Sequence, residues 1–407
     1  MKPLASLSLA AGALLSACHS VTEPPKPTMA LYGGAPAPTV TKTDIGPLGP
    51  GVPGQCLFPL SKAIDVNDRG LVVGWGQSRE GDESLCTVHG FIWDNGTLTN
   101  LGAIAPVAVN NHDQIAGNTI LVGPTHAALL QAGALTDLGT LGGDMSGVTA
   151  LNDHGQIVGF STTASGATHG FLWQDGAMTD LGTLGGLSSR AIALNEHGQV
   201  VGNSTTGTGA THGFLWQDGV MIDLGTLGGA TTEVRALNAR GQIVGRSTTP
   251  TGDGHAFLWE DGVMTDLGTN GGTQSDAQAV NKDGQIAGIS GTGIGFLTPH
   301  AFLWQDGTMT DLGTPQPQGD FFGFLKINDR GQIVGTIAFA GSLRAGRCWL
   351  WQDGTVTELP TALAGETVAL NKHGQVAGWD LFPFSFVMRA VLWTVDRGGE
   401  QLASAQP

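Results

Sequence analysis

Residues 148–186 read VTALNDHGQIVGFSTTASGATHGFLWQDGAMTDLGTLGG, and most of the remaining chain repeats this stretch with small edits. Within it, two short apolar runs meet across NDHG and two more meet across QDG. Tight turns that contain glycine join antiparallel neighbours. The stretch therefore predicts two β-hairpins, or four short strands, in each repeat.

Both faces of the third strand in this stretch are apolar. In HGFLWQDG, the alternation of a β-strand places Phe171 and Trp173 on one face and Leu172 on the other. A strand with two apolar faces needs cover on both sides. This pattern is typical of a propeller blade or a stacked solenoid rung, in which each repeat is covered by the repeats before and after it.

The chain contains eight such repeats, which we call units 1 to 8. Each is marked by an asparagine that opens the first turn, at intervals of 42, 43 or 47 residues: Asn67, Asn110, Asn152, Asn195, Asn238, Asn281, Asn328 and Asn371. A second marker ends the third strand: Trp93, Leu130, Trp173, Trp216, Trp259, Trp304, Trp351 and Trp393. One period over most of the chain indicates a single repeat domain.

The two ends of the repeat array complement each other. The eighth unit reaches Trp393 but lacks a copy of the fourth strand, TDLGTLGG, whereas residues 43–49 (TDIGPLG) resemble that strand before the first unit begins. An N-terminal strand that completes the last blade is the way propellers close and remove their sheet edges. We therefore predict an all-β, eight-bladed β-propeller of four-stranded repeats of about 43 residues, closed by the N-terminal strand, in preference to a linear solenoid.

The repeat resembles the HAF family of extracellular repeats, named for a His-Ala-Phe motif. The motif occurs at His255 and His300, and His-Gly-Phe replaces it at His89, His169 and His212. HAFLWQDG, TDLGTLGG and ALNxxGQIVG occur together and in order over residues 40–396, although Arg347 and Arg389 take the histidine position in the last two units. The resemblance implies a secreted or surface repeat protein of a family without an assigned reaction.

The N-terminal residues are typical of an exported lipoprotein. Residues 1–17 carry one cation followed by an apolar run too short for a permanent transmembrane helix, and residues 15–18 (LSAC) resemble a bacterial lipobox. We expect cleavage before Cys18 and acylation of this residue; the alternative is an ordinary signal peptide with a chance cysteine. His19, rather than Asp, follows the cysteine, which by analogy favours the outer membrane.

The domain boundaries follow from these patterns. We assign 1–17 to the signal peptide, 18–39 to a Pro-rich tether, 40–396 to the propeller and 397–407 to a C-terminal tail. The membrane is then a partner through the N-terminal lipid, and we expect a monomer. The net charge of -16 and pI near 4.9 exclude nucleic acid as a partner, because phosphate binding needs clustered Lys and Arg.

No residue pattern predicts catalysis, a cofactor or a metal. A histidine recurs at one position in units 1 to 6: His89, His126, His169, His212, His255 and His300. A metal site needs several ligands that converge, so we interpret these residues as hydrogen-bonded and structural. The Asp-Val-Asn-Asp-Arg-Gly run at Asp65 lacks the later carboxylates of a calcium loop. The chain has no nucleophile motif, Walker loop, dinucleotide fingerprint or distinct carboxylate pair.

The cysteines suggest one disulfide. Cys56 precedes the first strand of unit 1 and Cys86 lies in the long connection within that unit, so in an exported chain we predict a Cys56–Cys86 bond, with two free thiols as the alternative. Cys348 takes a small-residue position beside Trp349, and we predict a buried thiol there.

Candidate ligand contacts are the aromatic residues that depart from the repeat. Loop lengths vary only at one end of the strands, and two groups of phenylalanines fall in those variable connections: Phe321, Phe322 and Phe324, and Phe382, Phe384 and Phe386. They either contact a ligand or pack the larger ring. The favoured function is a lipid-anchored binding or scaffold module for a protein or glycan on the face of the variable connections. The alternatives are a propeller enzyme acting on polysaccharide and a structural surface protein without a specific ligand.

Overall fold

A computed structural model describes residues 38–46, 60–78, 87–120, 123–295, 299–313, 321–322 (backbone only), 325–338, 346–382 and 387–396. All of them belong to one compact unit, Ala35–Pro407. The signal peptide, Cys18, Cys56, Cys86, Phe324, Phe384 and Phe386 lie outside the described residues. Within the described ranges every regular element is a strand, and no helix there is long and apolar enough to cross a membrane.

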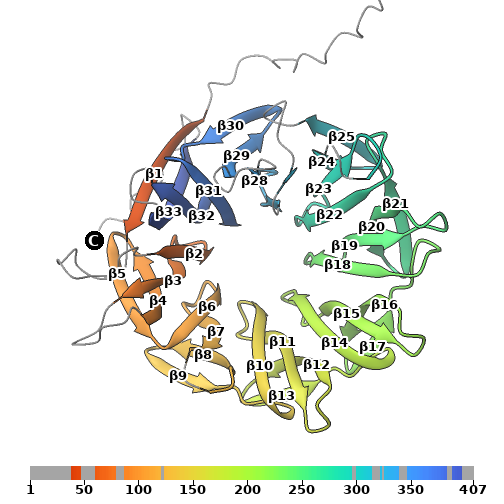
Figure 1. Ribbon diagram of the computed structural model, residues 1–407, viewed down its shortest axis with the longest axis horizontal. Helices are drawn as coiled ribbons and strands as arrows, with labels where there is room; N and C mark the ends of the chain where they lie inside the picture. The colour runs from red at the N-terminus through yellow and green to blue at the C-terminus, as the bar shows by residue number, and fades with distance from the viewer. Residues whose placement is uncertain are drawn as a thin grey trace, which may run out of the picture. The chain divides into compact units, whose positions relative to one another are not determined.

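The strands form antiparallel sheets in chain order (Figure 1). Units 1 and 2 contain β2 (Ser61–Val66), β3 (Val72–Ser78), β4 (Thr87–Asp94), β5 (Thr97–Gly102), β6 (Ile104–Val109), β7 (Ile115–Thr119), β8 (Ala127–Gln131) and β9 (Ala134–Asp137). Units 3 and 4 contain β10 (Gly142–Leu151), β11 (Ile157–Thr163), β12 (Thr168–Gln174), β13 (Ala177–Asp180), β14 (Gly185–Leu194), β15 (Val200–Thr206), β16 (Thr211–Gln217) and β17 (Val220–Asp223). One parallel pair, Thr168 with Ser188, joins these two units into a single sheet.

The second half of the chain continues the pattern. Units 5 and 6 contain β18 (Thr232–Leu237), β19 (Ile243–Thr248), β20 (Gly254–Glu260), β21 (Val263–Gly268), β22 (Ser275–Val280), β23 (Ile286–Gly291), β24 (Pro299–Gln305) and β25 (Thr308–Gly313). Units 7 and 8 contain β26 (Phe321–Phe322), β27 (Lys326–Ile327), β28 (Ile333–Ala338), β29 (Gly346–Gln352), β30 (Thr355–Leu359), β31 (Ala364–Leu370), β32 (Gln375–Phe382) and β33 (Val387–Asp396). The all-β fold and the four-stranded antiparallel repeat are confirmed.

The turns follow the local sequence. In the QDG turn of unit 3, Asp175 has φ 50° and Gly176 has φ 85°, so both central residues are left-handed. This is the geometry of a type I′ hairpin, whose twist matches that of the flanking strands. In the first turn of the same unit, Gly155 has φ 76°, and the Asn152 side chain accepts hydrogen bonds from the N–H groups of His154 and Gln156. Each hairpin is therefore specified by its own short motif.

The glycine that ends GQIVG has a steric role. A Cβ atom on Gly202 would lie 2.1 Å from the carbonyl oxygen of Arg190, on the neighbouring strand β14. The register of β14 shifts between Ala191 and Ala193, which marks a β-bulge beside this contact. Only glycine allows the two backbones to approach this closely.

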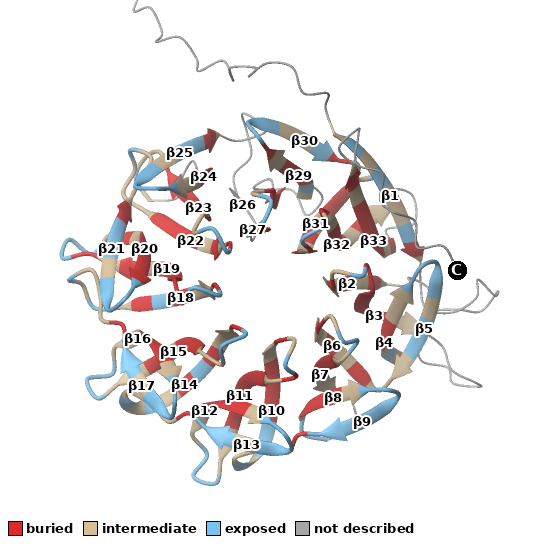
Figure 2. Cartoon of the chain, turned by 180° about the vertical axis from the view of Figure 1, so that it is seen from behind, coloured by how far each residue is buried: buried red, intermediate tan, exposed pale blue. Residues whose placement is uncertain are grey.

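The hydrophobic core lies between consecutive units. Phe171 and Leu172, on opposite faces of β12, are 0% and 8% exposed. Phe171 packs with Leu129 of unit 2, whereas Leu172 packs with Phe214 of unit 4. Figure 2 shows buried residues concentrated on the middle strands of the units, such as β11 and β15, and exposed residues on the outer strands, such as β9, β13 and β17. The prediction that both faces of β12 are buried is confirmed. The aromatic side chain at the centre of the core is Phe171, because Trp173 is only half-buried.

The strand β1 (Thr39–Gly46) pairs antiparallel with β33 and gives unit 8 a fourth strand. Residues 43–46 repeat the contacts of the TDLG strand: the Gly46 N–H donates to Asp44 at 2.9 Å, as the Gly182 N–H donates to Asp180 at 2.8 Å. The Ser61 hydroxyl donates to the Gly46 carbonyl, as Ser189 does to Gly182. The resemblance of residues 43–46 to the fourth strand therefore extends to hydrogen bonding.

Candidate functional site

The first turns of all eight units meet through their marker asparagines. The Nδ2 of each asparagine donates to the backbone carbonyl of the marker asparagine in the next unit, and Asn371 of unit 8 donates to Asn67 of unit 1. The eight distances lie between 2.8 and 3.1 Å, and every one of these asparagines is buried. Because each donor points to the following unit, the bonds form a closed cycle of eight.

A pocket of about 360 Å³ lies at these turns; we call it the axial pocket. Its lining comes from units 1, 2, 3, 4, 7 and 8: Val66, Asn67, Asp68, Val109, Asn110, Asn111, Leu151, Asn152, Asp153, Glu196, Asn328, Asp329, Leu370, Asn371 and Lys372. The residue before each marker is apolar, and the marker itself is tied into the cycle of hydrogen bonds. The residue after the marker differs among units and gives the pocket its individual chemistry.

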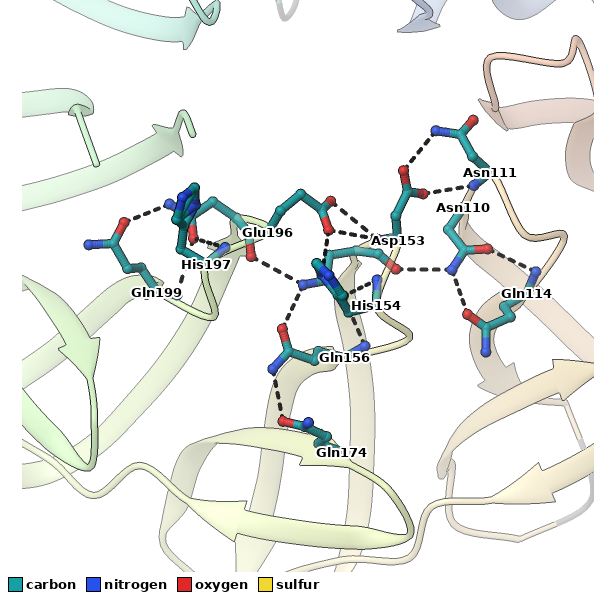
Figure 3. Close-up of polar contacts among 12 residues, drawn as sticks. Asn110, Asn111, Gln114, Asp153, His154, Gln156, Gln174, Glu196, His197 and Gln199 are labelled. Carbon is teal, nitrogen blue, oxygen red and sulfur yellow. Dashed lines mark hydrogen bonds and ion pairs between the residues drawn. The ribbon is translucent and has the colours of Figure 1, made fainter. Parts of the chain in front are cut away.

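The residues after the markers connect units 1 to 4, and Figure 3 shows the contacts among units 2, 3 and 4. The Asn111 side chain accepts from the Asp68 N–H at 2.9 Å, and the Asn111 N–H donates to Asp153 at 2.8 Å. The Asp153 N–H then donates to both oxygens of Glu196 at 3.2 Å. The amide of Asn111 also donates to the carboxylates of Asp68 and Asp153, which relieves the repulsion between them.

Units 7 and 8 contribute the remaining charges of the pocket. Lys372 lies 2.9 Å from the Asp68 carboxylate, and its N–H donates to the same carboxylate. Partial burial disfavours the charge on Asp68, but the hydrogen bonds and charge of Lys372 outweigh it and hold the pKa of Asp68 below its ordinary value. With Asp329, four carboxylates face one ammonium among the described lining residues, so the pocket is acidic and rich in hydrogen-bond acceptors.

Two charged residues interrupt a row of alanines on the innermost strands. The position two residues before the marker is alanine in six units, but Asp65 in unit 1 and Lys326 in unit 7. The Asp65 carboxylate accepts from the Val66 and Val109 N–H groups, both at 2.9 Å. Burial raises the pKa of Asp65 despite these bonds and the charge of Lys326. Part of the Lys326 surface meets solvent, yet desolvation by the surrounding protein lowers the pKa of its ammonium group.

The recurring histidines have the expected hydrogen bonds. In units 2 to 6, the Nδ1 of the histidine lies 2.8–3.0 Å from the aspartate of the adjacent TDLG strand, as for His212 and Asp223. Arg347 and Arg389 replace the histidine with ion pairs of 2.8 Å to Glu358 and Asp44. Within the described part of the chain, no group of three or more His, Cys, Asp or Glu residues is arranged to hold a metal ion.

Of the six predicted phenylalanines, the structure describes the backbone of Phe321 and Phe322 and the whole of Phe382, so their role as ligand contacts stays a prediction. Phe321 and Phe322 form β26, which pairs with Ala338 and Ile337 of β28, so they belong to a strand of unit 7 rather than to an insertion. Phe382 is the last residue of β32, paired with Val387, so its placement in a loop was wrong. Its half-buried ring packs under Lys42 and Arg389, at 5.1 and 4.9 Å.

The prediction for Cys348 is confirmed. The residue is buried and free, and burial raises the pKa of its thiol to about 12. The Cys56–Cys86 bond and the acylation of Cys18 stay predictions, because these residues lie outside the described ranges.

Comparisons with known proteins give similarity of fold alone. No protein-family model and no curated protein matches the chain. Among solved structures, the β-propeller domain of the Trilobed protease from Pyrococcus furiosus matches 74% of this chain and 98% of its own, at 10% identity and a TM-score of 0.47. A puromycin-hydrolyzing peptidase from Mycobacterium tuberculosis matches 74% of this chain at 14% identity and a TM-score of 0.49. The match spans about half of that peptidase, 52%.

TolB from Acinetobacter baumannii is a further similar structure. It matches 80% of this chain and 82% of its own, at 13% identity and a TM-score of 0.37. Similarities this distant carry no argument about chemistry.

The sequence did not predict the axial pocket. Each first turn by itself has the appearance of a structural hairpin, and the constant loop length there suggested no ligand. The usable signal was the residue after each marker, which varies between Asp, Asn, Glu, Ala and Lys while the turn around it stays constant.

Proposed function

We propose that the chain is a lipid-anchored, extracytoplasmic binding module built as an eight-bladed β-propeller of HAF-type repeats. The cycle of eight asparagine hydrogen bonds and the pairing of β1 with β33 support eight units and closure by the N-terminal strand. The lipobox-like residues 15–18 support export and attachment through Cys18, with the outer membrane as the location.

We infer a binding function from the axial pocket, and we propose a glycan as its ligand. Carboxylates and carboxamides that converge on a polar pocket can accept from and donate to the hydroxyl groups of a sugar, and Val66, Val109, Leu151 and Leu370 give it an apolar part. A volume of about 360 Å³ lies within the usual range of small-molecule sites. The lining includes the residue after the marker asparagine, which differs from unit to unit. A turn with a purely structural role would not need different residues at this position.

A binding role is preferred to hydrolysis of polysaccharide. A glycosidase needs one carboxylic acid that stays protonated and a second that is ionised. Asp68, whose pKa is lowered by Lys372, does not suit the role of the acid. The carboxylates of Asp153 and Glu196 are held by backbone N–H groups of the preceding unit, which positions them as fixed acceptors.

The proposal of glycan binding predicts that a substitution in the axial pocket lowers the affinity for oligosaccharides. We expect the full-length chain in detergent to bind neutral oligosaccharides on an array, and Asp153→Ala to weaken the best of them about tenfold or more, because each hydrogen bond to a charged group contributes about 1.5–3 kcal/mol. Titration calorimetry would measure the affinities. Asp144→Ala, an exposed aspartate at the opposite end of the same unit, is the matched control.

The same samples separate the rival functions. Equal affinities of the wild type and Asp153→Ala would remove the axial pocket from the proposal. Hydrolysis of a bound oligosaccharide by the wild type would favour the enzyme, and a chain that retains no glycan would contradict the proposed ligand.

The lipid anchor is tested at Cys18. We expect Cys18→Ser to leave the precursor uncleaved and to abolish labelling with a palmitate analogue, because the thiol and the new amino group carry the acyl chains. Labelled protein would be measured by gel fluorescence after membrane fractionation. Equal incorporation in both forms would contradict the anchor.

A further inference from the structure

A second pocket lies between units 3 and 4, toward the ends of the strands opposite to the marker asparagines. It has a volume of about 360 Å³, and we call it the Arg190 groove. Its lining comes from β12, β14, β15 and β16: Thr168, Ser188, Ser189, Arg190, Asn203, Ser204, Thr205 and Thr211. None of these lining residues is acidic, which contrasts with the four carboxylates of the axial pocket.

Arg190 is a cation without an acidic partner among the described residues. The residue five positions before the marker is also charged in units 1, 5, 6 and 8, where ion pairs neutralise it. Lys62 pairs with Glu366 at 2.9 Å, while Glu233 and Asp276 flank Arg235 at 3.1 and 3.2 Å. The Arg190 guanidinium instead stacks on the Phe160 ring of unit 3, at 4.0 Å. Desolvation lowers the pKa of Arg190, and no acidic group of the described chain offsets this effect.

The contact with Phe160 holds the Arg190 guanidinium in place but does not occupy its N–H donors. A guanidinium held over the face of an aromatic ring makes no hydrogen bond to that ring, so its N–H groups stay available for the two parallel bonds that a carboxylate accepts. The Arg190 guanidinium makes no hydrogen bond or ion pair with the described residues. The cation is therefore held in place by Phe160 with its donors free.

The lining of the Arg190 groove contains further hydrogen-bond donors, some of which are already engaged and some of which are free. The hydroxyls of Ser189, Ser204 and Thr205 already donate to backbone carbonyls. Those of Thr168, Ser188 and Thr211 have no hydrogen-bond partner among the described residues. The Asn203 side chain uses its oxygen to accept from the Val234 N–H at 2.9 Å, which leaves its NH₂ group as a donor. One guanidinium, one amide NH₂ and three hydroxyls thus border one groove.

We propose that the Arg190 groove binds the carboxylate of an acidic sugar, with the guanidinium on the carboxylate and the hydroxyl and amide groups on the sugar hydroxyls. The axial pocket cannot take this role, because its four carboxylates would repel an anionic ligand. The chain has a net charge of -16, so long-range repulsion opposes the approach of any polyanion. At physiological ionic strength this repulsion is screened beyond about 8 Å, so the Arg190 guanidinium determines whether the carboxylate of the ligand binds.

Titration calorimetry of the full-length chain in detergent with glucuronic acid tests the proposal. We expect binding at 0.15 M salt and a loss of about tenfold or more in Arg190→Gln, because a charge-assisted pair is removed. Arg190→Lys keeps the positive charge but lacks the two parallel N–H donors of a guanidinium, so it should bind with intermediate affinity. Thr211→Val should weaken binding without a change of charge. The control is Arg347→Gln, an exposed arginine that is already paired with Glu358.

Glucose, acetate and sulfate distinguish the sources of binding. We expect weaker binding of all three than of glucuronic acid, since each lacks either the carboxylate or the sugar hydroxyls. Acetate or sulfate that bound as tightly as glucuronic acid would overturn the acidic sugar as the ligand. Equal affinity of the wild type and Arg190→Gln, with equal melting temperatures, would overturn the site itself, and this outcome is independent of glycan binding in the axial pocket.

Discussion

Lys42→Met is expected to lower the free energy of unfolding by about 3–5 kcal/mol, because it leaves the buried carboxylate of Asp380 without its cation. The Asp380 side chain is 0% exposed, and Lys42 reaches it from the N-terminal strand β1. The remaining described partner of this carboxylate is the Ala362 N–H, which donates to both oxygens at 2.9 Å. Urea unfolding followed by tryptophan fluorescence would measure the loss.

Two variants isolate the cause of this effect. Lys282→Met removes an exposed lysine that pairs with Asp283, and we expect little or no change in the free energy of unfolding, because water screens an exposed pair. Lys42→Met combined with Asp380→Leu removes both buried charges and should recover most of the stability. A Lys42→Met chain as stable as the wild type would mean that the Lys42–Asp380 ion pair does not stabilise the packing of β1 on unit 8.

The second large effect is expected at the cycle of marker asparagines. Asn195→Asp preserves shape but replaces the NH₂ group by a carboxylate oxygen, which then faces two acceptors: the Asn238 carbonyl at 3.1 Å and the Gln199 side-chain oxygen at 2.6 Å. The buried Asn238 carbonyl and the half-buried Gln199 oxygen lose their donor, and a negative charge is introduced at a buried position, so we expect a loss of about 3 kcal/mol or more. Chemical unfolding at pH 7 would measure it.

The pH dependence of this variant provides an internal check. Protonation of the introduced carboxyl group would restore one donor and remove the buried charge. Burial raises the pKa of such a group above its ordinary value of about 4, so the destabilisation should shrink as the pH falls toward that value. Asn95→Asp is the control: it is exposed in the outer turn of unit 1, where five other units have aspartate, and we expect a change within about 0.5 kcal/mol. A loss at Asn195 no larger than that at Asn95 would contradict the structural role of the cycle.

The turns and strands could be predicted because their causes are local. Asp175 and Gly176 adopt the two left-handed conformations of a type I′ turn, and a motif of three residues is enough to indicate it. The His212–Asp223 contact joins adjacent strands 11 residues apart, so the repeat itself suggested a structural role for the histidine. Burial of both faces of β12 followed from alternation alone.

The candidate sites could not be predicted, because they depend on how units assemble. Lys372 and Asp68 are 304 residues apart and meet in the axial pocket only through the packing of unit 8 against unit 1. Arg190 and Phe160 look like two unrelated departures from the repeat until unit 4 packs on unit 3. Phe382 was placed in a loop because its sequence breaks the repeat, whereas pairing with Val387 extends β32 to include it.

The sequence by itself determined the repeating unit: its four strands, its two turns and its two apolar faces. These features arise from backbone conformation and side-chain alternation, which act over a few residues and recur wherever the motif recurs. The tertiary structure decided which non-repeated residues become neighbours, such as Lys42 and Asp380, 338 positions apart. Such pairs depend on the rotation from one unit to the next, and no local pattern encodes that rotation, because it is set by the packing of whole sheets.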